Sequence, residues 1–174
     1  DHFNQAVLLR VEEGSLVTLD RLREVLLALV VQHDMLRATY ARDGGEWRQE
    51  VRASEGSRAP FVHVEEIDLT AIPEDVIGAR IGDECQRIQT AMRLSGPLVR
   101  VGLIRLADGT ARILFAVHHL VIDGVSWRVI FEDVQRSFEL LLRGERPTPV
   151  AKTTSFRAWS ELLRARTPRF ESQE

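Results

Sequence analysis

Two strongly apolar runs near the middle of the chain constrain its fold more than any other feature. They are LVRVGLIRL at 98–106 and ARILFAVHH at 111–119, separated by ADGT at 107–110. Asp-Gly between two β-prone runs supplies the backbone geometry of a tight turn. Strands this apolar are usually buried on both faces. The sequence therefore predicts a β-hairpin in the centre of a sheet.

The rest of the pattern predicts strands and helices around this hairpin. Strands are expected at 2–11 and 61–69, with a second hairpin over 36–51 that turns at Asp43-Gly44-Gly45. Apolar residues at helical spacing predict helices at 18–33, 73–92, 125–142 and 155–164. The fold class is therefore an α/β (α+β) sandwich, in which helices pack on a mixed β-sheet.

Three of these helices carry apolar stripes that specify their buried faces. In the first, Thr18 is placed as the N-cap, and the core positions are Leu22, Val25, Leu26, Leu29 and Val30. In the second, Pro73 takes the first helical position, and the stripe is Val76, Ile77, Ile81, Cys85, Ile88 and Met92. In the third, the stripe is Val129, Ile130, Val134, Phe138, Leu141 and Leu142. Cys85 lies on a stripe, so we expect a buried thiol rather than a reactive one.

Composition excludes several classes of protein. A chain of 174 residues is about one domain long. With 23 basic and 26 acidic residues its net charge is -3, which gives no reason to expect a nucleic-acid partner. The longest apolar run, at 25–31, is shorter than the roughly 20 residues of a membrane span. A single cysteine fits a cytoplasmic protein, and a start at Asp1 without a leader suggests a piece excised from a longer chain.

The segment HHLVIDGVSW at 118–127 carries the residues with the clearest chemistry. Side chains alternate along a strand, so His119 shares a face with Phe115 and Val117, whereas His118 points to the opposite packing layer. His119 then projects from the strand end beside the N-terminus of the next helix. The positive end of that helix favours a neutral imidazole that can accept a proton, as a general base does.

The same segment also allows structural interpretations. Asp123 could orient an imidazole, as in a catalytic triad, but we favour a role in holding the turn, by pairing with an arginine and capping the helix, with Gly124 supplying backbone freedom. An adjacent histidine pair is more often structural than catalytic. His2, His33 and His63 lack ligand spacing, so no metal site is predicted. The chain contains no GxSxG, Walker A or GxGxxG motif.

These residues carry a family resemblance. HHLVIDG at 118–124 resembles the HHxxxDG motif of the condensation-domain superfamily of non-ribosomal peptide synthetases, whose fold is related to that of chloramphenicol acetyltransferase. HDMLRATY at 33–40 and GPLVRVGLIRL at 96–106 are similar to two further segments of that superfamily. The resemblance implies a chloramphenicol acetyltransferase-like lobe.

Three other segments resemble epimerization domains more than domains that form peptide bonds. They are HFNQAVLLR at 2–10, VIDGVSWRVIFEDV at 121–134 and KTTSFRAWSELL at 152–163. By this resemblance, residues 1–166 are the N-terminal lobe of a V-shaped domain with an active-site tunnel between two lobes. Residues 167–174 form a polar tail whose composition allows disorder, and the C-terminal lobe is expected to be missing from this chain.

The resemblance also implies a substrate, partners and residue roles. The tunnel of the family admits the 4'-phosphopantetheine arm of a peptidyl carrier protein, bearing an aminoacyl or peptidyl thioester, and no cofactor is bound directly. Carried over to this sequence, His119 is the acid/base that inverts the α-carbon from L to D. His118, Asp123 and Gly124 shape the site, with Arg37 as the candidate partner of Asp123. Ser126 and Trp127 line the tunnel, and a place in the core is an equal alternative for Trp127.

The opposing acid/base of epimerization domains is a glutamate of the C-terminal lobe, so we expect the chain alone to have little or no epimerase activity. Two alternatives stay open. In a condensation or dual-function domain, His119 would assist the attack of an amine on a thioester. A catalytically silent lobe would only bind a carrier protein. A lobe separated from its partner lobe and from adjacent synthetase modules would also expose a face that could self-associate.

Overall fold

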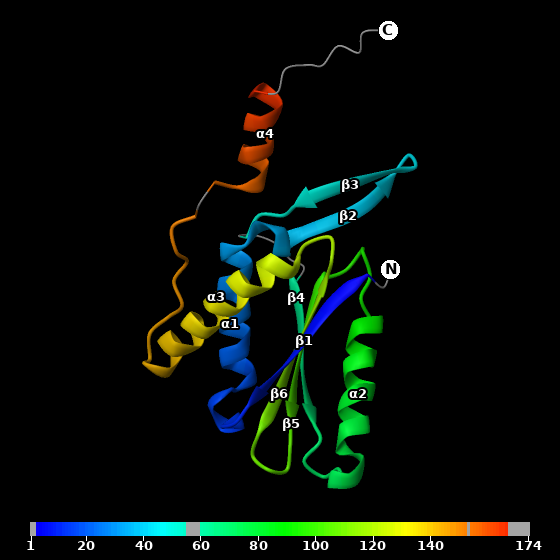
Figure 1. Ribbon diagram of the computed structural model, residues 1–174, viewed down its shortest axis with the longest axis vertical. Helices are drawn as coiled ribbons and strands as arrows, with labels where there is room; N and C mark the ends of the chain where they lie inside the picture. Colours follow the sequence, from blue (N-terminus) through cyan, green and yellow to red (C-terminus); the bar gives the residue numbers. More distant parts are fainter. Residues whose placement is uncertain (1–2, 55–59, 153, 167–174) are drawn as a thin grey trace.

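A four-stranded β-sheet lies between two layers of helices in the computed structural model of the chain (Figure 1). The structure describes residues 3–54, 60–152 and 154–166. The strands, in the order β1-β6-β5-β4, are β1 (Asn4–Val11), β6 (Ala111–His118), β5 (Val99–Arg105) and β4 (Val62–Asp68). Both β1 and β5 run antiparallel to β6, whereas β4 runs parallel to β5. The mixed sheet and the central position of the apolar hairpin confirm the predictions from the sequence.

The two faces of the sheet are covered by different helices. Helices α1 (Leu19–Gln32) and α3 (Gly124–Leu142) cover one face, and α2 (Glu74–Thr90) covers the other (Figure 1). Alternation along β6 divides the core accordingly, since Phe115 and Val117 pack in the cluster formed with α1 and α3. Leu114 and Ala116 pack instead with Ile88 of α2. The predicted parity of this strand is therefore confirmed.

The first helix and the hairpin that follows it form largely as predicted. The hydroxyl of Thr18 accepts a hydrogen bond from the backbone N–H of Arg21 at 3.2 Å, which caps α1. Two short 3₁₀ turns, η1 (Gly14–Leu16) and η2 (Asp34–Arg37), flank α1, and η2 replaces the first residues of the expected strand. Strands β2 (Ala38–Asp43) and β3 (Glu46–Val51) form a separate two-stranded sheet that projects from the body of the protein (Figure 1).

Several predicted core positions are wrong. Pro73 is the N-cap of α2 rather than its first helical residue. Val76 is 44% exposed, because it lies on the same face of the helix as the charged residues Asp83 and Arg87. In α3, Val129 and Leu142 are half exposed. The stripe on α2 therefore begins one residue later than expected.

Cys85 packs on the α2 side of the sheet and is half-buried. Burial, with a smaller contribution from the neighbouring carboxylate of Glu84, raises the pKa of its thiol. A raised pKa reduces the thiolate fraction on which reactivity depends. The thiol is thus only partly buried, where the sequence predicted a buried one, and its raised pKa agrees with the expectation that it is not a reactive one.

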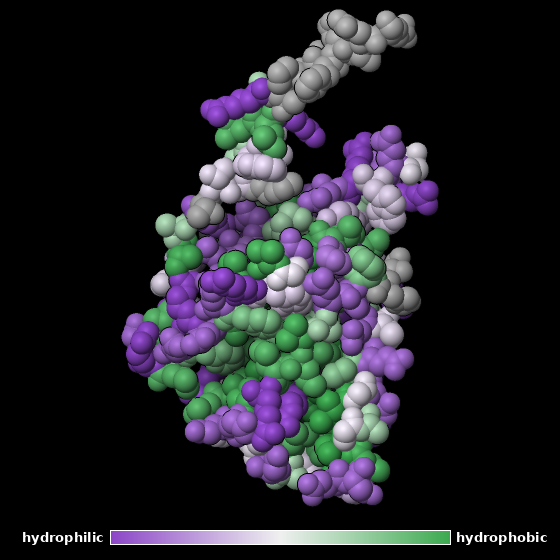
Figure 2. Space-filling model, viewed as in Figure 1, coloured by the Kyte–Doolittle hydropathy of each residue, from purple (hydrophilic) through white to green (hydrophobic). Residues whose placement is uncertain are grey.

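The surface is mixed in character. Apolar side chains gather over the middle of the face on which β1 lies, with polar side chains around them (Figure 2).

Helix α4 (Phe156–Arg166) follows the segment that leaves α3. No helix in the described parts of the chain is both long and apolar enough to cross a bilayer. The tail predicted at 167–174 lies outside the described residues.

Candidate active site

His119 lies one residue beyond the end of β6, on the face of the sheet that α1 and α3 cover. Its backbone N–H donates to the carbonyl oxygen of Phe3 at 2.8 Å, which extends the pairing of β1 with β6. The imidazole stacks on the ring of Phe3, with centroids 5.0 Å apart and planes inclined by 13°. The ring is therefore held at the strand end from both its backbone and its face.

The hydrogen bonds of His119 determine which of its nitrogens carries a proton. Nδ1 lies 2.7 Å from the carbonyl oxygen of Ile122. Because a carbonyl can only accept, Nδ1 is the donor. Nε2 lies 3.2 Å from the side-chain nitrogen of Gln5, which can only donate. The neutral ring therefore presents Nε2 as a proton acceptor, the state that a general base requires.

Trp127 lies in the first turn of α3 and belongs to the core. It is buried, and its indole stacks on Phe131 with centroids 5.2 Å apart. Its Nε1–H donates to the side-chain oxygen of Gln5 at 2.7 Å. Trp127 is thus both a core residue and a neighbour, through Gln5, of His119.

Gln5 is a site residue that reasoning from the sequence missed. It lies on β1 opposite Val117, so its side chain points to the same face as His119. Gln5 has the same strand parity as Val7 and Leu9, whose side chains pack against the core. A polar residue at such an inward-facing position was the signal in the sequence that could have identified it.

His118 has a different environment from its neighbour. It is buried on the opposite face, where it pairs in register with Asn4, whose side chain donates to the carbonyl of Gln89 in α2. Its Nδ1 accepts a hydrogen bond from the backbone N–H of Leu120 at 3.2 Å. Burial lowers the pKa of His118. A buried, neutral ring that accepts from the turn fits the packing role expected from strand parity.

Asp123 caps α3. Its carboxylate accepts hydrogen bonds from the backbone N–H of Ser126 at 2.7 Å and from the Ser126 hydroxyl at 2.6 Å. These two bonds, the one from the hydroxyl first, lower the pKa of Asp123. Gly124 is the first helical residue and is not among the glycines with positive φ, so the expected need for its backbone freedom is wrong.

The ion pair expected between Asp123 and Arg37 is not formed. The guanidinium of Arg37 is buried and donates to the carboxylate of Asp34 at 2.8 Å and to the carbonyl of Arg52 at 2.9 Å. It also donates to the carbonyl of Val30, in the last turn of α1. Free carbonyls at a helix C-terminus attract a cation. The turn η2 therefore uses Arg37 to close the end of α1 instead of reaching the site.

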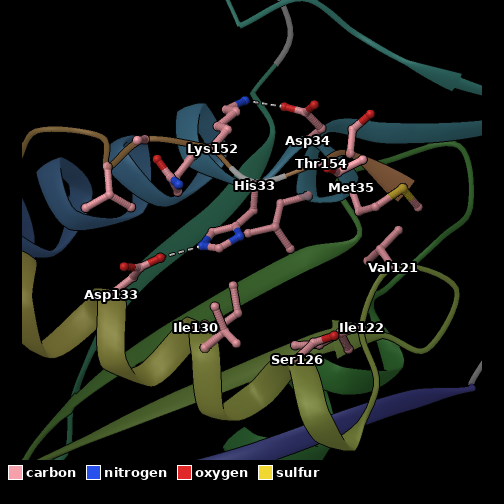
Figure 3. A pocket seen from close by; sticks show the side chains of 16 residues that line it. His33, Asp34, Met35, Val121, Ile122, Ser126, Ile130, Asp133, Lys152 and Thr154 are labelled. Atoms are coloured by element: carbon pink, nitrogen blue, oxygen red, sulfur yellow. Dashed lines mark hydrogen bonds and ion pairs between the residues drawn. The ribbon is translucent and has the colours of Figure 1, made fainter. Parts of the chain in front are cut away.

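A groove of about 470 Å³ lies beside this region, between the end of α1, the first half of α3 and residues 150–152, 154 and 155 (Figure 3). His33 points across it to the carboxylate of Asp133, with Nε2 2.7 Å from Oδ2. Lys152 bonds to Asp34 at 2.6 Å, which is the main cause of the lowered pKa of Asp34. Ser126 is the predicted site residue that lines this groove.

Within the described residues, no three His, Cys, Asp or Glu side chains gather as the ligands of a metal ion would.

Comparison with known proteins identifies the family. A sequence-family model named Condensation domain matches residues 1–174. The chain belongs to the condensation domain family. Chondramide synthase cmdD of Chondromyces crocatus is 38% identical over 168 residues, which cover 95% of this chain and 4% of that protein. Tyrocidine synthase 1 of Brevibacillus parabrevis is 34% identical over 163 residues, covering 93% of this chain and 14% of that protein. The chain thus spans only a small part of the relatives that it matches.

Two longer solved chains contain a part that shares the fold of this condensation-family chain. The epimerization domain from the third module of tyrocidine synthetase B superimposes with a TM-score of 0.84 and 34% identity, over 94% of this chain and 36% of that one. The first condensation domain of the calcium-dependent antibiotic synthetase, in complex with a substrate analogue, gives a TM-score of 0.74 at 23% identity, over 94% of this chain and 40% of that one. The second likeness shows a shared fold. The chain thus has the fold of one chloramphenicol acetyltransferase-like lobe.

Proposed function

We propose that this chain is the N-terminal lobe of an epimerization domain in a non-ribosomal peptide synthetase. Its substrate is an aminoacyl or peptidyl thioester on the 4'-phosphopantetheine arm of a peptidyl carrier protein. The observation that carries the proposal is the single acceptor nitrogen of His119, held at a strand end by Phe3 and Ile122. The likeness to the tyrocidine synthetase epimerization domain, at 34% identity, supports this choice of reaction.

The chemistry needs one base and one acid on opposite sides of the α-carbon. A thioester carbonyl acidifies the Cα–H bond, so Nε2 of His119 takes the proton while the bonding electrons pass into the enolate oxygen. The α-carbon becomes planar, and a proton delivered to its other side gives the inverted centre. Asp123 is already engaged with Ser126, so we assign the opposing group to the rest of the domain, as we do the contacts with the carrier protein and adjacent modules.

A condensation activity is the second candidate, because the matched family model is that of the condensation domain. In that reaction the same Nε2 would accept a proton from an amine as it attacks the thioester. The geometry of His119 serves either reaction. The three segments at 2–10, 121–134 and 152–163 that resemble epimerization domains favour the first.

The test uses the complete domain that contains this chain and a carrier protein loaded with an L-amino acid. Incorporation of deuterium at Cα and formation of the D-aminoacyl product are followed in ²H₂O. We expect both, and a loss of at least about 100-fold in His119→Ala, because a positioned general base contributes a factor of this order. His63→Gln, on β4, is the matched control and should keep the activity.

Two outcomes would overturn the proposal. Exchange that persists in His119→Ala would remove its assigned role. Amide formation with a second loaded carrier, without exchange at Cα, would assign the domain to condensation instead.

A further inference from the structure

Three side chains and one carbonyl form a continuous row of hydrogen bonds through the candidate site. Trp127 Nε1 lies 2.7 Å from Gln5 Oε1, Gln5 Nε2 lies 3.2 Å from His119 Nε2, and His119 Nδ1 lies 2.7 Å from the carbonyl oxygen of Ile122. The row joins the first turn of α3, strand β1 and the turn after β6. Both ends of the row are of fixed polarity, since an indole N–H only donates and a carbonyl only accepts.

This fixed polarity determines the orientation of every group in the row. Trp127 must face the oxygen of the Gln5 amide, so the NH₂ group of Gln5 faces His119. The NH₂ group donates, so Nε2 of His119 accepts. All the bonds therefore run in one direction, from the indole to the carbonyl of Ile122, and the orientation of Gln5 follows from its partners.

A proton on Nε2 would conflict with this arrangement. The new N–H of His119 would face the NH₂ group of Gln5, and two donors cannot pair. Rotation of the amide would present its oxygen to His119, but would turn the NH₂ group toward the indole N–H of Trp127. When Nε2 is protonated in this geometry, either the bond between Gln5 and His119 or the bond from Trp127 to Gln5 is therefore lost, so the row of hydrogen bonds favours an unprotonated Nε2.

The two supporting residues are held firmly enough for this effect. Gln5 on β1 pairs with Val117 on β6, and Val117 lies two residues before His119. The pairing of the two strands therefore sets the distance between Gln5 and His119. Trp127 is 9% exposed and stacks on Phe131, which in turn meets Phe115 edge-on. The indole therefore cannot easily follow the amide if the amide rotates.

We infer that Gln5, oriented by Trp127, is a positioning residue that keeps Nε2 of His119 free of a proton and aims its lone pair. This inference rests on the proposed function, in which His119 is the base. Gln5 acts on the reaction through His119. When the substrate enters, the hydrogen bond from Gln5 to Nε2 of His119 must break before Nε2 can accept the Cα proton. The strength of that bond therefore also determines how readily the base becomes available.

The direct test observes His119 in the ¹⁵N-labelled chain by long-range ¹H–¹⁵N correlation across a pH series. The parent should show Nδ1–H with an unprotonated Nε2. In Gln5→Glu, a carboxylate of the same shape accepts from Nε2–H, so both ring nitrogens should be protonated at a pH where the parent carries one proton. Trp127→Phe keeps the stacking but frees the amide to rotate, and should give a change in the same direction. Gln5→Met removes the donor that opposes a second proton. Nδ1–H should remain, because Ile122 selects it, and Nε2 should take up its proton at a pH between those of the parent and of Gln5→Glu.

The second readout is the pH profile of Cα deuterium exchange in the complete domain. Gln5→Glu should lose at least about 10-fold near neutral pH and recover part of the rate at higher pH, because the base must first lose its extra proton. Gln5→Met should be rescued less by high pH than Gln5→Glu, because part of its loss comes from a lone pair of Nε2 that is no longer aimed. Circular dichroism of each variant verifies that it is folded.

The two readouts separate the failures of the two proposals. If the ring nitrogens of Gln5→Glu and Trp127→Phe titrate as in the parent, or if the parent carries its proton on Nε2, the positioning role is overturned whatever the activity. If the spectra change as expected while His119→Ala keeps its exchange activity, Gln5 does control the ring, but His119 is not the base and the proposed function falls.

Discussion

His33 and Asp133 join the end of α1 to the middle of α3 through a contact of 2.7 Å between Nε2 and a carboxylate oxygen. Their side chains are 22% and 14% exposed, so water competes little for either group. Arg136 bonds to the other oxygen of Asp133 at 2.8 Å. The contact therefore closes one side of the groove next to the candidate site and fixes the spacing of the two helices that cover that face of the sheet.

A double-mutant cycle measures this contact. We predict a coupling of about 1.5–3 kcal/mol between His33→Ala and Asp133→Ala in the free energy of unfolding from urea denaturation, as for hydrogen bonds to charged groups. The exposed pair of Asp20 and Arg23 on α1 is the control, and should give less than about 0.5 kcal/mol. Equal couplings for the two pairs would show that the contact between α1 and α3 contributes no more to stability than an exposed ion pair does.

Burial of His118 predicts a loss of stability on mild acidification. Its pKa lies below the ordinary value of 6.5 because burial disfavours the charged ring. Between the lowered pKa and about 6.5 the unfolded chain binds more protons than the folded one, so the free energy of unfolding falls as the pH drops through that window. We expect a lower urea midpoint at pH 5.5 than at pH 7.5, and a smaller difference in His118→Gln, which can still accept from Leu120.

The acidic groups with lowered pKa act in another window. Asp34 and Glu65 have ordinary values of 3.8 and 4.5, so the stability that they contribute is lost only as the pH falls below those values. His63→Gln, which removes a histidine that is 44% exposed, is the control. If His63→Gln and His118→Gln reduce the pH dependence equally, burial of His118 is not its cause.

The features that were predictable from the sequence are those that depend on near neighbours. The turn at Gly44 and Gly45, both with positive φ, follows from local backbone preference. The cap at Thr18 and the apolar runs of β5 and β6 follow in the same way from residues that are adjacent or one turn apart. These signals suffice for the order of the elements, the central hairpin and the parity of β6.

Contacts between distant segments could not be predicted in this way. Partners such as His33 and Asp133, or Gln5 and Trp127, are more than 95 positions apart, and no spacing rule connects them. Arg37 was misassigned because the turn η2 directs its guanidinium to the carbonyls of α1, a choice that only the three-dimensional arrangement reveals.

Asp123 is expected to stabilise α3 through the N-cap that it forms. Asp123→Ala removes both acceptor contacts with Ser126, whereas Asp123→Asn keeps an oxygen that can accept them. We predict a fall of about 2–4 °C in Tm for Asp123→Ala, as for the loss of an N-cap in a chain of this size, and a smaller change for Asp123→Asn. Differential scanning calorimetry distinguishes the two, and similar losses in both would point to the charge instead of the cap.

Gly14 is expected to be the least replaceable glycine of the described fold. A Cβ there would lie 2.7 Å from the carbonyl oxygen of Gly109 and 3.0 Å from the carbonyl carbon of Thr110, and both atoms belong to the backbone of the turn between β5 and β6. The backbone N–H of Gly14 also donates to that same oxygen at 3.0 Å, so the two segments cannot separate without losing the bond. We predict that Gly14→Ala lowers the free energy of unfolding by about 1–3 kcal/mol, as overpacking does.

The matched control is Gly82→Ala in the middle of α2, where a Cβ would meet nothing within 4 Å. Alanine loses less backbone freedom than glycine when a helix forms, so this variant should be more stable by about 0.5–1 kcal/mol. Urea denaturation of the two variants should therefore move the midpoint in opposite directions. A Gly14→Ala midpoint equal to that of the parent would mean that the turn between β5 and β6 shifts without cost, and that its contact with Gly14 does not fix the end of the central hairpin.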